Sequence, residues 1–209
     1  AAAPVTTVGN LHNFNTVASP QNFDALTAAA PYLDLFWADP LAGSSNDYDL
    51  FVLNSAGTTV TTASTNLQNG TQDPWEEVFR PAGYGVGSRV VIVQATGAAN
   101  RFLHLATNRG RLGIATNGET HGHNAPAGSG FGVAATPAFS PFNFPSGGLF
   151  FYGPYPNLFS ASDKIETFSS DGPRRMFFKG DGTLLGPAGN FSSTGGVAFT
   201  QPIVTAADG

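Results

Sequence analysis

The residues 120–130, THGHNAPAGSG, hold the densest group of side chains that could perform chemistry, because His121 and His123 lie on either side of a glycine. Residues two apart in an extended segment project from the same face. Both imidazoles could therefore contribute to a zinc site or act in proton transfer. The remaining ligands of a zinc site are not evident in the sequence. A metal site, a catalytic histidine and a piece of scaffold all remain open for this stretch.

Three aspartates form the second group. Asp47 and Asp49 share one face at the mouth of an expected hairpin, and Asp39 lies on the preceding loop. Carboxylate oxygens are ligands that calcium prefers, so these three residues are the candidates for a bound calcium ion. The spaced Asp/Asn–Gly loop of an EF-hand is absent. The alternative is that these carboxylates cap turns or place charge on a sheet edge.

Other titratable residues favour structural roles. Glu76 and Glu77 are adjacent, so on a strand they face opposite ways and cannot flank one glycosidic bond. His12 and His104 stand alone in the sequence and are interpreted as half-buried, hydrogen-bonded imidazoles. The sequence contains neither a glycine-rich phosphate loop nor a nucleophile elbow. None of these isolated residues therefore indicates a catalytic role or a required cofactor.

The composition excludes several classes of protein. Charged residues make up 11% of the chain, against about 25% in an ordinary soluble domain. The formal net charge of −5 disfavours nucleic acid as a partner, because such proteins need clustered Lys and Arg. No run approaches the ~18 apolar residues of a membrane span, so a membrane partner is not expected. The chain has no cysteine and hence no disulfide framework.

Short strands with turn residues between them must position these groups. The segment 46–64, NDYDLFVLNSAGTTVTTAS, predicts a β-hairpin with a four-residue connection at 54–57. Residues 20–30 either start a short helix or lead into the next strand. The other predicted strands are 32–40, 76–81, 88–96 and 100–107. This pattern predicts a mainly β protein with an antiparallel, jelly-roll-like β-sandwich, to which we assign residues 5–107.

The composition shifts after residue 107, and we assign 108–209 to a second, β-rich domain. Its segment 137–162, PAFSPFNFPSGGLFFYGPYPNLFSAS, has no clear period. The many aromatic residues give this segment something to bury, whereas disordered segments have few aromatics. We expect an ordered long loop.

Three segments of this second part resemble subtilisin-like serine proteases. HGHNAPAGSGFGVAAT (121–136) resembles the short helix and following strand after the oxyanion-hole region. ETFSSDGP (166–173) is similar to the F-S-S-x-G-P hairpin of that family. QPIVTAADG (201–209) resembles the strand end that precedes the loop of the nucleophilic serine, with departures at Ile203 and at Ala207-Asp208. The first hundred residues more loosely resemble a β-sandwich inserted into some secreted members.

The resemblance implies that the chain is a non-catalytic internal segment of a secreted, extracellular serine endopeptidase. Its second part would be a partial segment of the α/β catalytic core. The parent would hydrolyse peptide bonds through an acyl-enzyme, and the triad would lie outside this chain, which alone would be inactive. His121 and His123 would then belong to the scaffold, because the family's catalytic histidine lies far upstream of the F-S-S hairpin. Ser169 and Ser170 would be structural.

The partners that follow are the remainder of the parent protease domain and the protein or peptide substrate of the parent. Exposed strand edges would also allow a homo-dimer. From a different class, the alternative is a free-standing β-sandwich module that binds carbohydrate or protein. That alternative explains the sandwich and the low charge but not the F-S-S-D-G-P segment. Within the protease interpretation, Trp37, Trp75 and Tyr84 are the exposed aromatic candidates through which the inserted sandwich would screen or extend the substrate cleft, although core packing is the competing use of both tryptophans.

Overall fold

The computed structural model describes residues 8–115, 132–138, 153–166, 169, 172–200 and 202–208. All regular secondary structure within these ranges is β-strand, and most strand pairs are antiparallel. The mainly β class predicted from the sequence is confirmed. The chain divides into two compact units, the first made of Ala1–Ala115 with Phe177–Gly196 and the second of Thr116–Met176 with Val197–Gly209.

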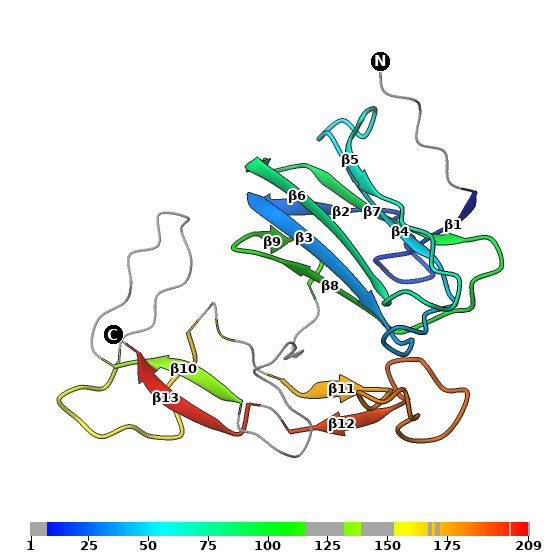
Figure 1. Ribbon diagram of the computed structural model, residues 1–209. Helices are drawn as coiled ribbons and strands as arrows, with labels where there is room; N and C mark the ends of the chain where they lie inside the picture. Colours follow the sequence, from blue (N-terminus) through cyan, green and yellow to red (C-terminus); the bar gives the residue numbers. More distant parts are fainter. Residues whose placement is uncertain are drawn as a thin grey trace. The chain divides into compact units, whose positions relative to one another are not determined.

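The first unit contains a six-stranded sheet in the order β5-β4-β7-β2-β9, with β1 also paired to β7 (Figure 1). Every pair in it is antiparallel. Its strands are β1 Gly9–Leu11, β2 Asp24–Ala28, β4 Tyr48–Leu53, β5 Val60–Ser64, β7 Arg89–Ala95 and β9 Arg111–Leu112. β4 and β7 form its centre over six register positions, Tyr48↔Gln94 to Leu53↔Arg89.

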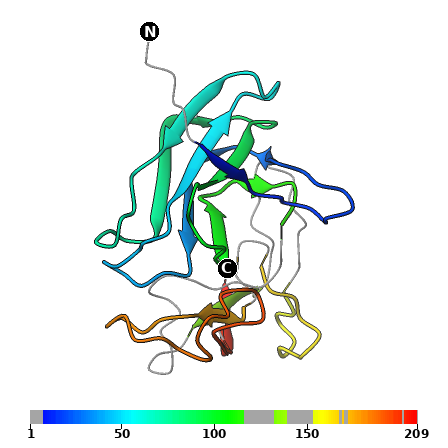
Figure 2. The ribbon, with the colours of Figure 1, turned by 90° about the vertical axis from the view of Figure 1, so that its right-hand side faces the viewer.

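A three-stranded antiparallel sheet in the order β6-β3-β8 forms the other layer of this unit (Figures 1 and 2). Its strands are β3 Ala30–Trp37, β6 Trp75–Tyr84 and β8 Leu103–Thr107. β6 continues past Pro81, which a central strand would not tolerate, because proline cannot donate a ladder hydrogen bond. The edge position of β6 removes that conflict.

The core lies between the two layers and follows the alternation of the strands. Leu33 and Leu35 of β3 pack in one cluster with Leu50 and Val52 of β4, and all four are fully buried. Burying such a side chain stabilises a fold by about 1.5–3 kcal/mol. The remaining buried members are Leu26, Ala30, Trp37, Tyr48, Val78, Tyr84, Val90 and Ile92.

The segment 177–196 belongs to this unit through aromatic contacts. The ring of Phe177 lies 5.5 Å from the ring of Phe102 and 6.0 Å from the ring of Phe191, measured between centroids. The guanidinium of Arg101 lies 4.3 Å from the centroid of the Phe191 ring, a cation–π contact. A segment far from β8 in the sequence thus covers Arg101 and Phe102, which directly precede β8.

The second unit holds two strand pairs among its described residues. β10 Val133–Pro137 pairs in parallel with β13 Val204–Asp208, in the register Val133↔Val204 to Pro137↔Asp208. β11 Arg174–Met176 pairs antiparallel with β12 Val197–Phe199. Residues 153–166 form neither helix nor strand, and the rest of the loop predicted at 137–162 lies largely outside the described residues.

The structure corrects the predicted length of the β4–β5 connection and decides between the two alternatives for residues 20–30. The hairpin between β4 and β5 is confirmed, but its connection spans 54–59 rather than four residues. Asn54 lengthens this connection because its Oδ1 accepts hydrogen bonds from the backbone N–H groups of Thr58 and Thr59. The helix considered for residues 20–30 is wrong, since this stretch leads into β2.

Candidate functional site

The outer side of the three-stranded sheet carries a row of aromatic side chains. Leu33 and Leu35 of β3 are buried in the core, so by the alternation of a strand Tyr32, Asp34 and Phe36 project from the opposite side. β6 repeats the pattern with a second set. We define the aromatic face by its four aromatic and two acidic residues: Tyr32, Phe36, Trp75, Phe79, Asp34 and Glu77.

Cross-strand pairing sets the order of side chains on the aromatic face. Phe36 pairs with Trp75, and their ring centroids lie 6.0 Å apart with planes at 23°. Tyr32 pairs with Phe79, with centroids 6.2 Å apart. Trp75 is 39% exposed and Phe79 59% exposed. Aromatic rings held at this exposure can contact a ligand without a prior change of conformation.

Two carboxylates lie between the aromatic pairs. Asp34 and Glu77 are register partners on neighbouring strands, an arrangement that normally destabilises a sheet. Tyr32 donates a hydrogen bond to Glu77. Burial of the phenol, this hydrogen bond and the charges of Glu77 and Asp34 together raise the pKa of Tyr32 to about 12. The face therefore combines apolar ring surface with negatively charged hydrogen-bond acceptors.

The substitution Glu77→Gln tests this geometry. It removes a negative charge that favours the neutral phenol, so the pKa of Tyr32 should fall from about 12 toward the ordinary value of 10. Burial remains, so the return should be incomplete. The ¹³Cζ chemical shift of labelled tyrosine measures this titration. Tyr48, whose raised pKa comes first from burial and involves no contribution from Glu77, is the internal control; an unchanged Tyr32 titration would contradict the arrangement.

Asp39, one of the three calcium candidates, lies in a buried hydrogen-bond network. Its Oδ1 forms an ion pair with Nε of Arg101 at 2.7 Å. Its Oδ2 accepts hydrogen bonds from Oγ of Ser44 at 2.9 Å and from the backbone N–H of Asn46 at 3.0 Å. Burial alone would raise the pKa of Asp39, but these donors outweigh it and hold the pKa below its ordinary value. Both oxygens of Asp39 thus already have protein donors.

Asp47 and Asp49, the other two candidates, are placed differently. Asp47 precedes β4, and its Oδ1 accepts a hydrogen bond from the backbone N–H of Gln68 at 3.4 Å. Burial raises the pKa of Asp47 against that hydrogen bond. Asp49 is buried within β4, opposite Val93. Within the described ranges, no three His, Cys, Asp or Glu side chains form a group that could hold a metal ion, and calcium binding at these aspartates stays a prediction.

The prediction that Glu76 and Glu77 face opposite ways is confirmed. Glu76 is fully buried, whereas Glu77 lies on the aromatic face. The Glu76 carboxylate accepts hydrogen bonds from the backbone N–H of Asn66 at 2.9 Å and from Nε2 of Gln68 at 2.8 Å. Burial raises the pKa of Glu76 against these hydrogen bonds. Glu76 therefore stabilises the connection between β5 and β6 through these hydrogen bonds.

The histidines do not come together where the structure describes them. His121 and His123 lie outside the described residues. His12 is half-buried, with its ring edge-on to Phe14 at 4.7 Å, and burial lowers its pKa. His104 lies in β8 as the register partner of Phe36. Zinc binding at His121 and His123 stays a prediction.

Of the three tryptophan and tyrosine candidates, two belong to the core. Trp37 is 5% exposed and donates its indole N–H to Oγ of Ser44 at 3.0 Å, and Tyr84 is fully buried. Trp75 is exposed on the aromatic face. The sequence interpretation missed the partners of Trp75. The alternation in YLDLFW (32–37) and WEEVF (75–79) carries the signal that could have found them.

Comparison with known proteins found no relative of this chain. No family model, no curated protein and no solved structure matches this chain. Within the part of the chain that the structure describes, no helix is long and apolar enough to cross a membrane. The functional argument therefore depends on the residues and their geometry alone.

Proposed function

We propose that the chain is a non-catalytic region of a secreted subtilisin-like serine endopeptidase. In this proposal the jelly-roll-like sandwich, about 5–107, is inserted next to a partial segment of the protease core, about 108–209. The parent protein hydrolyses peptide bonds through an acyl-enzyme, and its catalytic serine, histidine and aspartate lie elsewhere in the same polypeptide.

The parallel pairing of β10 with β13 carries this proposal. The two strands are the ends of two segments that resemble the protease family, 121–136 and 201–209. The family resemblance implies a parallel sheet, and a parallel pair needs a long crossover connection, whereas neighbouring hairpin strands run antiparallel. An all-antiparallel binding module would have no need of such a pair.

Ser169 of the F-S-S segment supports a structural role for that segment. Its Oγ accepts a hydrogen bond from the backbone N–H of Ala135 in β10, at 3.0 Å. The backbone N–H of Glu166 donates to the carbonyl of Ala135 at 2.8 Å. Glu166 and Ser169 thus both hold the backbone of Ala135 in β10. This hydrogen bond is consistent with a structural role of the Ser169 hydroxyl, which is the role that the resemblance implies.

The purified 209-residue chain should not react with a fluorophosphonate probe and should not hydrolyse peptide or ester substrates. The physical reason is that serine attack needs a general base and an oxyanion hole, which the proposal places outside this chain. Labelling followed by gel fluorescence measures the reaction, with an active serine protease as the positive control. A labelled 209-residue chain would contradict the proposal.

The aromatic face favours a second candidate, a module that binds carbohydrate. Exposed rings can stack on the apolar faces of sugar rings, and Asp34 and Glu77 can accept hydrogen bonds from hydroxyl groups. If this second candidate is correct, the parallel pair of β10 and β13 is not part of a protease core.

Tryptophan fluorescence tests the carbohydrate candidate directly. The chain contains two tryptophans, and Trp37 is buried while Trp75 is exposed on the aromatic face. A polysaccharide that stacks on this face should change the emission of the wild type, and the change should disappear in Trp75→Phe. Phe79→Ala should weaken the binding about tenfold, since an aromatic contact contributes about 0.5–1.5 kcal/mol beyond its buried area. A response that persists in Trp75→Phe would contradict the second candidate.

A further inference from the structure

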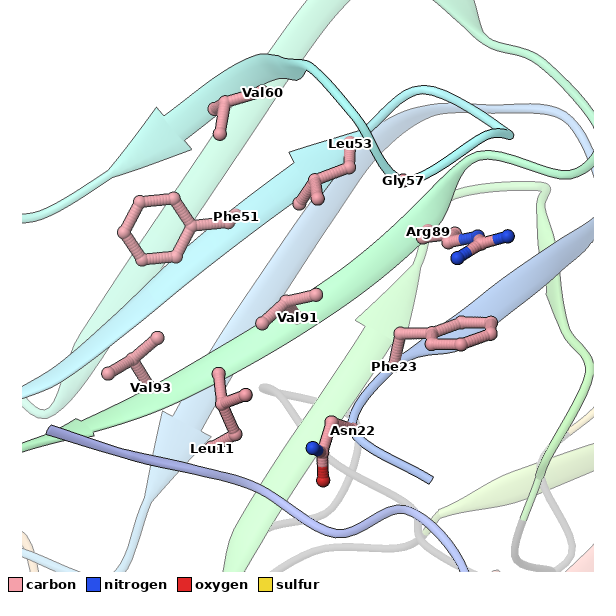
Figure 3. A pocket seen from close by; sticks show the side chains of 10 residues that line it. All are labelled: Leu11, Asn22, Phe23, Phe51, Leu53, Gly57, Val60, Arg89, Val91 and Val93. Carbon is pink, nitrogen blue, oxygen red and sulfur yellow. The ribbon is translucent and has the colours of Figure 1, made fainter. Parts of the chain in front are cut away.

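The outer side of the six-stranded sheet holds an apolar groove with a volume of about 360 Å³ (Figure 3). This surface is on the opposite side of the sheet from Leu50, Val52, Val90 and Ile92, which lie in the core. The groove lies over β4 and β7 and is bordered by β1 and β5. Its apolar lining residues are Leu11, Phe23, Phe51, Leu53, Val60, Val91 and Val93.

Strand register explains why these side chains meet. Phe51 of β4 pairs with Val91 of β7, and Leu53 pairs with Arg89. Val93 pairs with Leu11 of β1. These are alternate residues of each strand, so they project from one side of the sheet. Arg89 thus lies at one end of this row of side chains, and the next two members of the row on β7 are Val91 and Val93.

Arg89 is held in place at that end of the groove. Its guanidinium carbon lies 4.4 Å from the centroid of the Phe23 ring, a cation–π contact. On another side of the guanidinium, Gly57 leaves the room that the guanidinium occupies, because a Cβ at position 57 would lie 2.6 Å from Nη1 of Arg89. Figure 3 shows Arg89 next to Phe23 and Gly57, with Val93 and Leu11 farther along the groove.

The charge of Arg89 lacks an acceptor in the described part of the protein. The one ion pair found there joins Arg101 to Asp39, and the guanidinium of Arg89 makes no hydrogen bond to any described residue. Arg89 is half-buried, so its five N–H donors are partly shielded from water at the border of an apolar surface. Such a guanidinium complements a carboxylate, which it can bind through two parallel hydrogen bonds.

We propose that this groove binds an alkyl carboxylate, with the carboxylate on Arg89 and the chain along Val91, Val93 and Phe51. The distance along β7 from Arg89 to Val93 is four residues, or about 13 Å, which an alkyl chain of about eight to twelve carbons spans. The proposal does not depend on the protease assignment, since every residue in it belongs to the sandwich.

The lining favours an alkyl chain over a peptide. A peptide with a C-terminal carboxylate would also bring backbone N–H and C=O groups, and each needs a hydrogen-bond partner. Besides Arg89, the described lining offers the side chain of Asn22 as its polar group. An alkyl carboxylate carries its polarity at one end, as the groove does.

Isothermal titration calorimetry with decanoate and decylammonium below their micelle concentrations, and with decanol below its solubility limit, tests the proposal. Decanoate should bind the wild type, decanol should bind at least tenfold more weakly, and decylammonium should not bind. Arg89→Gln should weaken decanoate binding about tenfold to a hundredfold, because a charged hydrogen bond is lost. Arg111→Gln, which changes an exposed arginine of β9, is the matched control and should leave the affinity unchanged.

A second variant tests the apolar part. Val60 is 43% exposed, so Val60→Asn should preserve the fold, which circular dichroism checks, and should weaken decanoate binding severalfold. Equal affinity of wild type and Arg89→Gln for decanoate, or equal affinity of the wild type for decanol and decanoate, would overturn the proposal. So would an apolar pentapeptide with a free C-terminus that binds more tightly than decanoate, or a dimer in light scattering that decanoate does not dissociate.

Discussion

Asp39→Asn should lower the free energy of unfolding of the sandwich by about 3–5 kcal/mol, because removing one member of a buried ion pair leaves the other charge uncompensated. The Asp39 side chain is 3% exposed and that of Arg101 is 16% exposed. The introduced amide would also point its N–H groups at the groups that donate hydrogen bonds to the Asp39 carboxylate in the wild type. Urea unfolding followed by near-ultraviolet circular dichroism measures the loss.

Two controls separate the ion pair from a general effect of substitution. Asp181→Asn changes a surface aspartate of the same unit and should leave the unfolding midpoint nearly unchanged. The double variant Asp39→Asn/Arg101→Met should be more stable than Asp39→Asn alone, because no unpaired charge remains and the methionine can still pack on Phe191. A loss below about 1 kcal/mol for Asp39→Asn would contradict the network.

The same residue gives the stability a defined pH dependence. The pKa of Asp39 in the folded protein lies below its ordinary value of 3.8. The folded state therefore binds the Asp39 proton less tightly than the unfolded state does. The stability from this carboxylate is present in full above pH 3.8 and is lost as the pH falls through the lowered pKa. The stability difference between wild type and Asp39→Asn should shrink over that range.

Leu35→Ala should destabilise the sandwich by about 2–5 kcal/mol, since it leaves a cavity between the two sheets. Leu35 is fully buried and belongs to the core cluster. Phe79→Ala, in the same sheet but 59% exposed, is the matched control and should cost much less although it removes a larger side chain. Chemical denaturation measures both variants. Equal losses would contradict the assignment of a buried and an exposed side to this sheet.

Local patterns in the sequence predict most of the sandwich strands. The alternation around Leu50 and Val52, followed by turn residues, predicts the hairpin of β4 and β5, and the strand predicted at 32–40 corresponds to β3, which ends at Trp37. The connection at 54–59 was predicted too short because Asn54 accepts backbone hydrogen bonds from two later residues, which composition alone does not reveal.

Pairing over long distances in the sequence could not be predicted in the same way. Asp39 and Arg101 are 62 positions apart, so the sequence grouped Asp39 with two other aspartates as calcium candidates and gave no sign of its ion pair with Arg101. The cation–π contacts of Arg101 with Phe191 and of Arg89 with Phe23 likewise depend on how loops fold back. The aromatic face was accessible in principle, since it needs only the alternation of two strands and their register.

The central claim is that this chain supports a serine endopeptidase whose catalytic groups lie elsewhere in the same polypeptide. Fluorophosphonate labelling of the full natural protein, followed by digestion and mass spectrometry, tests it most directly. We expect the label on a serine outside residues 1–209, in a polypeptide that also yields peptides of this chain. A label on Ser169 or any other serine of the chain, or a full protein that takes up no label, would contradict the claim.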